Sequence, residues 1–169
     1  MNKKAIIQLT RVDNRLVHGQ VGVTWVNSIN ADTIVVVDDD VVLNPMRQKL
    51  MEGVAHTSNV RIRFYSVDDF ANVYHQVESS QRLFLVVENP VTLMRLVKKG
   101  IFFDRVNFGN MHYQRGKVAF SRKMYVSEEE IDAINYLLEQ GVYLYYQDVP
   151  GTMQEKIGKL DYESMKKRR

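Results

Sequence analysis

The sequence contains no cysteine. That absence excludes disulfides, thiolate zinc sites, iron–sulfur clusters and a cysteine nucleophile. No apolar run approaches the roughly 18 residues that a membrane-spanning helix needs. The apolar stretch near the start is broken at Gln8, too early for a secretory signal. We therefore expect a cytoplasmic protein.

A strong excess of either charge is also lacking. The chain has 23 basic and 20 acidic residues, for a net charge of +3. Four of the basic residues lie together at the end, in residues 166–169, and without them the balance is −1 (19 basic against 20 acidic). The basic isoelectric point is thus a property of the end of the chain, and we expect no nucleic-acid partner.

The composition is that of one globular domain. Hydrophobic residues make up 45% and charged residues 25% of the chain, close to globular averages, so disorder is not expected. A chain of 169 residues buries about 70% of its extended surface on folding, enough for a sizeable core. We expect a single domain over residues 1–169, in which residues from about 153 to 169 form a loosely structured C-terminal tail.

Short apolar runs alternate with amphipathic segments of helical length. Several runs lack polar alternation, which is typical of strands buried on both faces of a parallel sheet. The expected strands are residues 5–12, 33–37, 60–65, 83–87, 105–108 and 142–147.

Capping residues mark the beginnings of the helices between these strands. Asn44 and Asn89 each precede a proline, Ser66 precedes an amphipathic segment over 67–78, and Ser127 begins a capping box. The alternation predicts an α/β fold: a single-domain open, mostly parallel sheet with helices on both faces. The mixed segment 111–126 predicts an antiparallel hairpin at the sheet edge.

Several catalytic signatures are missing. There is no G-x-G-x-x-G, G-x-x-x-x-G-K-[ST], H-E-x-x-H or G-x-S-x-G, so nucleotide-binding, zincin and serine-hydrolase sites lack their spacing. The acidic residues 38–40, with Asp13, are compatible with a Mg²⁺ site of the receiver type. However, the third strand ends in Tyr65 and Ser66, with no aspartate to accept a phosphoryl group. We predict no metal site and no cofactor.

The segment after the first strand carries the most informative residues. A helix is expected to begin near His18, and backbone N–H groups at such a start bind anions. Arg15 adds a planar guanidinium that can hold phosphate oxygens, and Gly19 permits close backbone approach. An imidazole beside a phosphate cradle suits accepting and donating a phosphoryl group. The pattern alone leaves equally open that His18 only packs against the loop or caps the helix.

The sequence has three other histidines and is compatible with two other classes of function. His112 follows the fifth strand and can face the same edge of the sheet as His18, whereas His56 and His75 lie on expected helices without ligand spacing. Two alternatives stay open. One is a non-catalytic module that binds a phosphorylated metabolite, and the other is a receiver-like regulator phosphorylated on aspartate.

The stretch T-R-V-D-N-R-L-V-H-G-Q-V-G-V-T-W, residues 10–25, resembles the opening of enzyme IIB components of the mannose/fructose/sorbose family. That family belongs to the bacterial phosphoenolpyruvate-dependent sugar phosphotransferase system. Segments 36–39, 107–111 and 147–150 also match in order, so the resemblance spans roughly residues 5–160. Phe108 stands where valine is commoner. The combination of motifs looks most like the N-acetylgalactosamine/galactosamine branch.

This resemblance implies a concrete function. His18 would take a phosphoryl group from a phosphohistidine of the IIA component and pass it to the sugar that enters through the membrane components IIC and IID. Arg15 would steady the phosphoryl oxygens, without a metal or an organic cofactor. The protein would be cytoplasmic and peripherally associated with the membrane complex, and a homo-oligomer stays open. The resemblance adds loop residues Asp13, Asn14, Leu16, Val17 and Gly19, and wall residues Gly109, Asn110, Met111 and His112.

Overall fold

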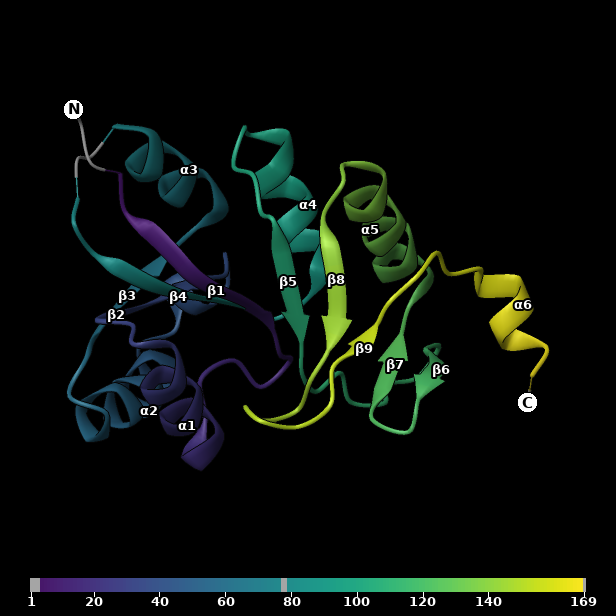
Figure 1. The fold of residues 1–169 in the computed structure, drawn as a ribbon, viewed down its shortest axis with the longest axis horizontal. Helices are drawn as coiled ribbons and strands as arrows, with labels where there is room; N and C mark the ends of the chain where they lie inside the picture. Colours follow the sequence, from purple (N-terminus) through teal and green to yellow (C-terminus); the bar gives the residue numbers. More distant parts are fainter. Residues whose placement is uncertain (1–3, 77–78, 169) are drawn as a thin grey trace.

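A seven-stranded sheet crosses the molecule in the computed structural model, which describes residues 4–76 and 79–168 (Figure 1). The strand order is β3-β2-β4-β1-β5-β8-β9, and every neighbouring pair is parallel except β8 and β9. The strands of this sheet are β1 (Ile6–Val12), β2 (Thr33–Val37), β3 (Arg61–Tyr65), β4 (Arg82–Val87), β5 (Arg105–Phe108), β8 (Tyr143–Tyr146) and β9 (Glu155–Lys156). The predicted α/β class with a mostly parallel sheet is confirmed.

Helices cover both faces of the sheet, as predicted. The helices are α1 (Gly19–Ile29), α2 (Pro45–Thr57), α3 (Val67–Gln76), α4 (Pro90–Lys98), α5 (Glu128–Glu139) and α6 (Tyr162–Lys166), with a short 3₁₀ turn at Val41–Leu43. Of the helix predicted over 67–78, positions 77 and 78 lie outside the described residues. In the described part of the chain, no helix is long and apolar enough to cross a membrane.

The alternation of side chains along the central strands creates two cores. In β2, Ile34 and Val36 point to one face and join the side chains of α1 and α2. Val35 and Val37 point to the other face and join those of α3, α4 and α5. Because both faces are covered, all five residues of β2 are buried, which explains why this strand shows no polar alternation in the sequence.

Side-chain caps fix where the helices begin. The Asn44 side chain accepts from the Arg47 N–H, and the Asn89 side chain accepts from the N–H groups of Val91 and Thr92. Ser127 forms the predicted capping box with Glu130. These caps also place the residues that follow each strand at the carboxyl edge of the sheet, where ligands of open α/β sheets bind.

The antiparallel elements differ from the prediction. The hairpin β6 (Val118–Ser121) and β7 (Met124–Val126) exists, but it forms a separate two-stranded sheet. The antiparallel edge of the main sheet is instead β9, within the segment expected to be a loose tail. There Ile157 is fully buried, and its N–H donates to the Leu144 carbonyl. The interior thus reaches beyond residue 153.

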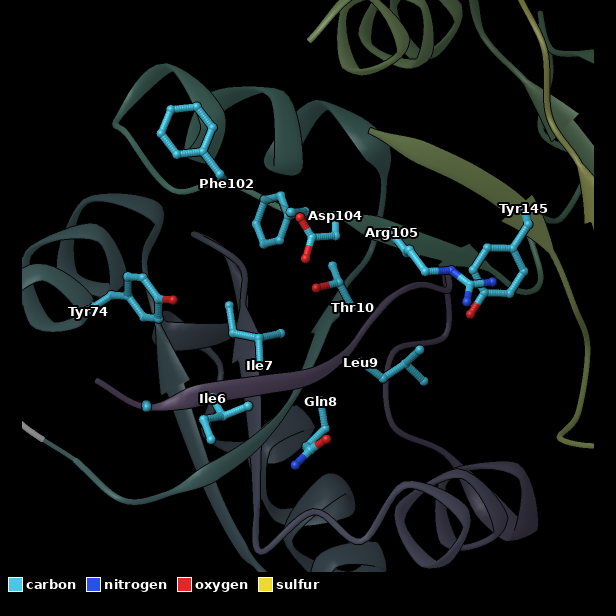
Figure 2. A pocket seen from close by; sticks show the side chains of 12 residues that line it. Ile6, Ile7, Gln8, Leu9, Thr10, Tyr74, Phe102, Asp104, Arg105 and Tyr145 are labelled. Atoms are coloured by element: carbon cyan, nitrogen blue, oxygen red, sulfur yellow. The ribbon is translucent and has the colours of Figure 1, made fainter. Parts of the chain in front are cut away.

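The sheet is split at its amino edge, where the parallel strands begin, on the opposite side from the carboxyl edge. Strand β1 pairs with β4 along its length but meets β5 only at Arg11 and Val12. A groove of about 470 Å³ opens between the first half of β1 and the start of β5. Figure 2 shows it lined by Ile7 and Thr10 on one side and by Arg105 against Tyr145 on the other. This groove lies away from the loop that follows β1.

Candidate functional site

The loop between β1 and α1 is shaped by Asp13. This residue is completely buried. Its carboxylate accepts from the backbone N–H of Arg15 at 3.0 Å, and its carbonyl accepts from the Leu16 N–H at 2.8 Å. Leu16 adopts the left-handed conformation, with φ of 56°, which a non-glycine residue keeps only when its surroundings enforce it. The loop is therefore a defined turn.

Two apolar side chains hold this turn against the body of the protein. Leu16 and Val17 are both 4% exposed and pack in the core that contains Trp25 and Val26 of α1. Their sequence neighbours Asn14 and His18 are half-buried, and Arg15 is exposed. The predicted loop residues thus divide into apolar anchors and polar groups at the surface.

His18 occupies the N-cap position of α1, as the expected helix start implied. Its Nδ1 lies 3.2 Å from the Leu16 carbonyl oxygen. Within the described chain, Nε2 has no hydrogen-bond partner. The His18 side chain makes no hydrogen bond to the backbone of α1. It therefore does not cap the helix, although the residue stands at the N-cap position. One ring nitrogen is held by the loop and the other remains without a protein partner.

The start of α1 is suited to an anion. Its first turn contains no acidic residue and receives no side-chain cap, so the positive end of the helix dipole is not compensated there. Gly19 and Gln20 are exposed at this end. Gly19 has φ of +46°, and a Cβ at this position would meet nothing within 4 Å. The glycine therefore serves the backbone conformation, since a side chain at this position would meet no steric obstacle.

Arg15 is the exposed charge of the loop. Its side chain is exposed and, within residues 4–76 and 79–168, has no hydrogen-bond or ion-pair partner. A guanidinium that is not engaged by the protein is free to bind the oxygens of a phosphoryl group. The predicted role of Arg15, which is to bind the oxygens of a phosphoryl group, requires a guanidinium without a protein partner.

Residues 109–112, which follow β5, were predicted to form a wall of the site. Only some of them lie beside the loop between β1 and α1. The Asn14 N–H donates to the Asn110 carbonyl at 2.9 Å, which joins the loop to this wall. Gly109 is buried beside it and His112 is exposed. Met111 does not line the site, because its side chain is fully buried in the core on the other face of the sheet.

A buried arginine, Arg11, was not among the predicted site residues. It is 2% exposed and forms an ion pair with Asp13 at 3.2 Å. Its guanidinium also donates to the Asn107 side chain and to the carbonyls of Gln147 and Asp148. Burial lowers the pKa of Arg11, and the Asp13 carboxylate opposes that shift. The sequence signal for this site was a charged residue in an otherwise apolar strand, since buried charges are almost always paired.

The segment after β8 is joined to the same place. The Asp148 carbonyl also accepts from Trp25 Nε1 at 3.1 Å, and the Trp25 ring lies 5.1 Å from the Arg11 guanidinium carbon. The Asp148 carboxylate pairs with Lys123, in the turn between β6 and β7, at 2.6 Å. This hydrogen bond raises the pKa of Lys123. Four segments far apart in the sequence are therefore joined beneath the loop: residues 11–13, residue 107, residue 123 and residues 147–148.

The acidic run after β2 has structural partners. Asp38 accepts from the N–H groups of Asp40 and Val41. Asp39 accepts from the Val67 N–H and pairs with Arg95 at 2.8 Å, and these bonds lower its pKa. The carboxylates of Asp38 and Asp39 thus act as turn and helix caps, the role that acidic residues after strands usually have.

Comparison with known proteins identifies the family. The model of the PTS system sorbose subfamily IIB component matches residues 7–169. The chain therefore belongs to the IIB components of the sugar phosphotransferase system, which transfer phosphoryl groups. The family works with IIA components and with membrane components of the IIC and IID type.

Individual relatives agree over most of the chain. The N-acetylgalactosamine-specific phosphotransferase enzyme IIB component 1 of Escherichia coli is 44% identical over 89% of this chain and 96% of its own length. A crystal structure of that component superimposes with a TM-score of 0.85 over 90% of this chain and 99% of that chain. The mannose-specific EIIAB component of E. coli is 32% identical over 95% of this chain, which spans 51% of that longer protein.

Proposed function

We propose that His18 is the residue that carries the phosphoryl group. The observation that carries this proposal is its position: an imidazole at the start of α1, with Nε2 unpartnered within the described residues. The family performs phosphoryl transfer, and His18 lies within residues 7–169, which the family model matches. Neither a metabolite-binding module nor a receiver-like regulator explains why an imidazole stands at this helix start.

The chemistry consists of two successive displacements. An imidazole nitrogen of His18 attacks the phosphorus of the donor phosphohistidine, and the bond from phosphorus to the donor nitrogen breaks. A sugar hydroxyl then attacks the phosphorus on His18, the bond from phosphorus to the imidazole nitrogen breaks, and the released imidazole takes up the hydroxyl proton. Because imidazole is a good leaving group, positioning and charge stabilisation suffice, and no metal or organic cofactor is required.

The surrounding groups have distinct roles in this proposal. Arg15 binds the equatorial oxygens of the transferring group through charge-assisted hydrogen bonds. Backbone N–H groups at the start of α1 add partial positive charge. Gly109 and Asn110 form the adjacent wall, and His112 affects docking more than chemistry.

The partners follow from the family and its relatives. We expect a IIA component as donor, because IIA and IIB are fused in the mannose-specific EIIAB relative. We expect IIC and IID components to present the sugar, with this chain in the cytoplasm at the membrane complex. The 44% identical relative is named as specific for N-acetylgalactosamine, so we propose N-acetylgalactosamine or galactosamine as the acceptor.

The test is phosphorylation by phosphoenolpyruvate, the general phosphotransferase proteins and a cognate IIA, followed by mapping of the modified residue. An acid-labile label is expected on His18 and should be absent from the His18→Ala variant. The variants His56→Ala, His75→Ala and His112→Ala are matched controls and should remain labelled. Full labelling of His18→Ala, or a Mg²⁺-dependent acyl phosphate on an aspartate, would show that the assignment is wrong.

The sugar is tested separately. Phosphorylated protein is mixed with membrane vesicles that contain IIC and IID, and transfer to N-acetylgalactosamine, galactosamine, mannose and sorbose is compared. Faster transfer to the amino sugars is expected. Equal transfer to mannose would contradict the proposed acceptor without affecting the role of His18.

A further inference from the structure

Both terminal nitrogens of the Arg11 guanidinium are engaged by the protein. Its Nη1 donates to the Asn107 side-chain oxygen and to the Gln147 carbonyl, the latter at 3.0 Å. Its Nη2 donates to the Asp13 carboxylate and to the Asp148 carbonyl, both at 3.2 Å. Each terminal nitrogen of a guanidinium carries two hydrogens, so all four terminal N–H groups have acceptors. None of them is left for a phosphoryl group.

The position of this guanidinium is tightly enclosed. On one side lies the ring of Trp25, 5.1 Å from the guanidinium carbon. On another side lies the backbone of Gly109, where an added Cβ would stand 2.1 Å from Nη2 of Arg11. Gly109 is therefore required because the Arg11 side chain occupies the space of a Cβ. In such an enclosure, Arg11 has little freedom to change its orientation.

The same guanidinium connects the two sides of the site. Its acceptor Asp13 also accepts from the Arg15 N–H, which sets the turn that leads to His18. Its other acceptors, the carbonyls of Gln147 and Asp148, belong to the segment after β8. Arg11 thus contacts the loop that contains His18 through Asp13. It contacts the segment after β8 through the carbonyls of Gln147 and Asp148.

We propose that Arg11 is a positioning residue for phosphoryl transfer. It holds the loop of residues 13–18 and the segment 147–148 at a fixed separation and does not touch the phosphoryl group. This inference rests on the proposed role of His18. Misplacement of reacting groups by about 1 Å can lower a rate by roughly a hundredfold, so loss of this arrangement acts on kcat. Docking of IIA uses exposed groups, so KM for phosphorylated IIA stays unchanged.

The main test is Arg11→Lys, which keeps the charge that faces Asp13 but cannot reach four acceptors in a plane. Steady-state phosphorylation by IIA is measured at increasing concentrations of phosphorylated IIA. We expect kcat to fall about a hundredfold with an unchanged KM. Hydrogen exchange of the Arg15 backbone N–H, which donates to Asp13, should become faster in the unphosphorylated protein.

Two further variants make the result decisive. Arg105→Lys is the matched control, because Arg105 is also an arginine of the sheet but stacks on Tyr145 at the amino-edge groove (Figure 2). This variant should keep the parental kcat and KM. Asn107→Ala removes one acceptor and leaves the ion pair with Asp13. It should show a smaller fall in kcat at an unchanged KM, and it decides the question if Arg11→Lys does not fold.

Several outcomes would overturn the inference. A folded Arg11→Lys protein with the parental kcat, a rise in KM alone, or an equal loss in Arg105→Lys would each do so. Unchanged exchange at the Arg15 N–H would show that Arg11 does not position the loop. If the parental protein is not labelled on His18, the proposed function fails instead, while the exchange measurement still reports on Arg11.

Discussion

The underside of the loop after β1 differs from its exposed rim in how polar groups are used. Beneath the loop, the charges of Arg11 and Asp13 are buried and paired with each other and with neighbouring segments. On the rim, Arg15 is exposed and Asn14 and His18 are half-buried, and the atoms His18 Nε2 and Asn14 Oδ1 are shielded from solvent without hydrogen-bond partners in the described residues. In the proposed function, the groups beneath the loop, whose hydrogen bonds are made within the protein, define its geometry, and the groups on the rim without such partners bind the phosphoryl group.

The two arginines make this difference concrete. Both carry the same charged group four residues apart, yet the terminal N–H groups of Arg11 all have protein acceptors, whereas the Arg15 side chain has none within the described residues. Proximity of a cation to the site is thus a poor guide to its role. Substitutions beneath the loop should therefore reduce stability and rate together, whereas substitutions on the rim should reduce only the rate.

The largest expected effect is that of Asp13→Ala. It leaves the Arg11 charge buried without its carboxylate, and breaking a buried pair in this way costs about 3–5 kcal/mol. Chemical denaturation should show this loss in the free energy of unfolding. Asp68→Ala is the control, because Asp68 pairs with Lys99 at the surface and exposed pairs contribute about 0–1 kcal/mol. Equal losses in both variants would contradict a special role for the buried pair.

On the rim, Arg15→Ala should slow phosphoryl transfer about a hundredfold, equivalent to about 3 kcal/mol of transition-state stabilisation. Its unfolding curve should match that of the parental protein, since the side chain has no partner within the described residues. Arg15→Lys should recover part of the rate, because a point charge replaces the charge but not the bidentate geometry. Rapid-quench kinetics with phosphorylated IIA measures all three proteins. Parental transfer by Arg15→Ala would remove Arg15 from the mechanism.

The strands were predictable because a strand buried on both faces of a sheet is apolar at consecutive positions. Residues 34–37 and 83–87 are apolar at consecutive positions, and the structure has them in β2 and β4. Strand β9 shows no such pattern, since Glu155 and Lys156 are exposed and polar. It pairs with β8 only because the neighbouring Ile157 is buried, a tertiary effect that no local pattern displays.

The position of the loop after β1 could be predicted from the sequence, whereas the buried groups beneath it could not. His18 and Arg15 follow directly after a strand, where topology brings ligand-binding residues together. Arg11 lies within the strand, and all its acceptors except Asp13 come from residues 96 to 137 positions later in the sequence. Met111 was misplaced for a related reason, because its backbone follows β5 at the site while its side chain turns into the core.

A smaller effect is expected for Gly109→Ala, which tests the enclosure of Arg11 from the other side. The new Cβ would overlap Nη2 of Arg11, and overpacking of this kind costs about 1–3 kcal/mol. Because the guanidinium must shift, the transfer rate should also fall. Gly53→Ala is the matched control, since a Cβ there meets nothing within 4 Å. A parental rate in a folded Gly109→Ala protein would show that the loop tolerates movement of Arg11.

The smallest effect is expected for Ser127→Ala, which separates stability from rate. Ser127 caps α5 through its bond to the Glu130 N–H, and loss of such a cap costs about 1 kcal/mol. Helix α5 lies on the face of the sheet that does not carry α1, so the rim and the underside of the loop should stay intact. The melting temperature should fall while kcat and KM for phosphorylated IIA remain parental. A lower kcat here would mean that any loss of stability slows transfer, and the rate effects of substitutions beneath the loop would then no longer indicate positioning.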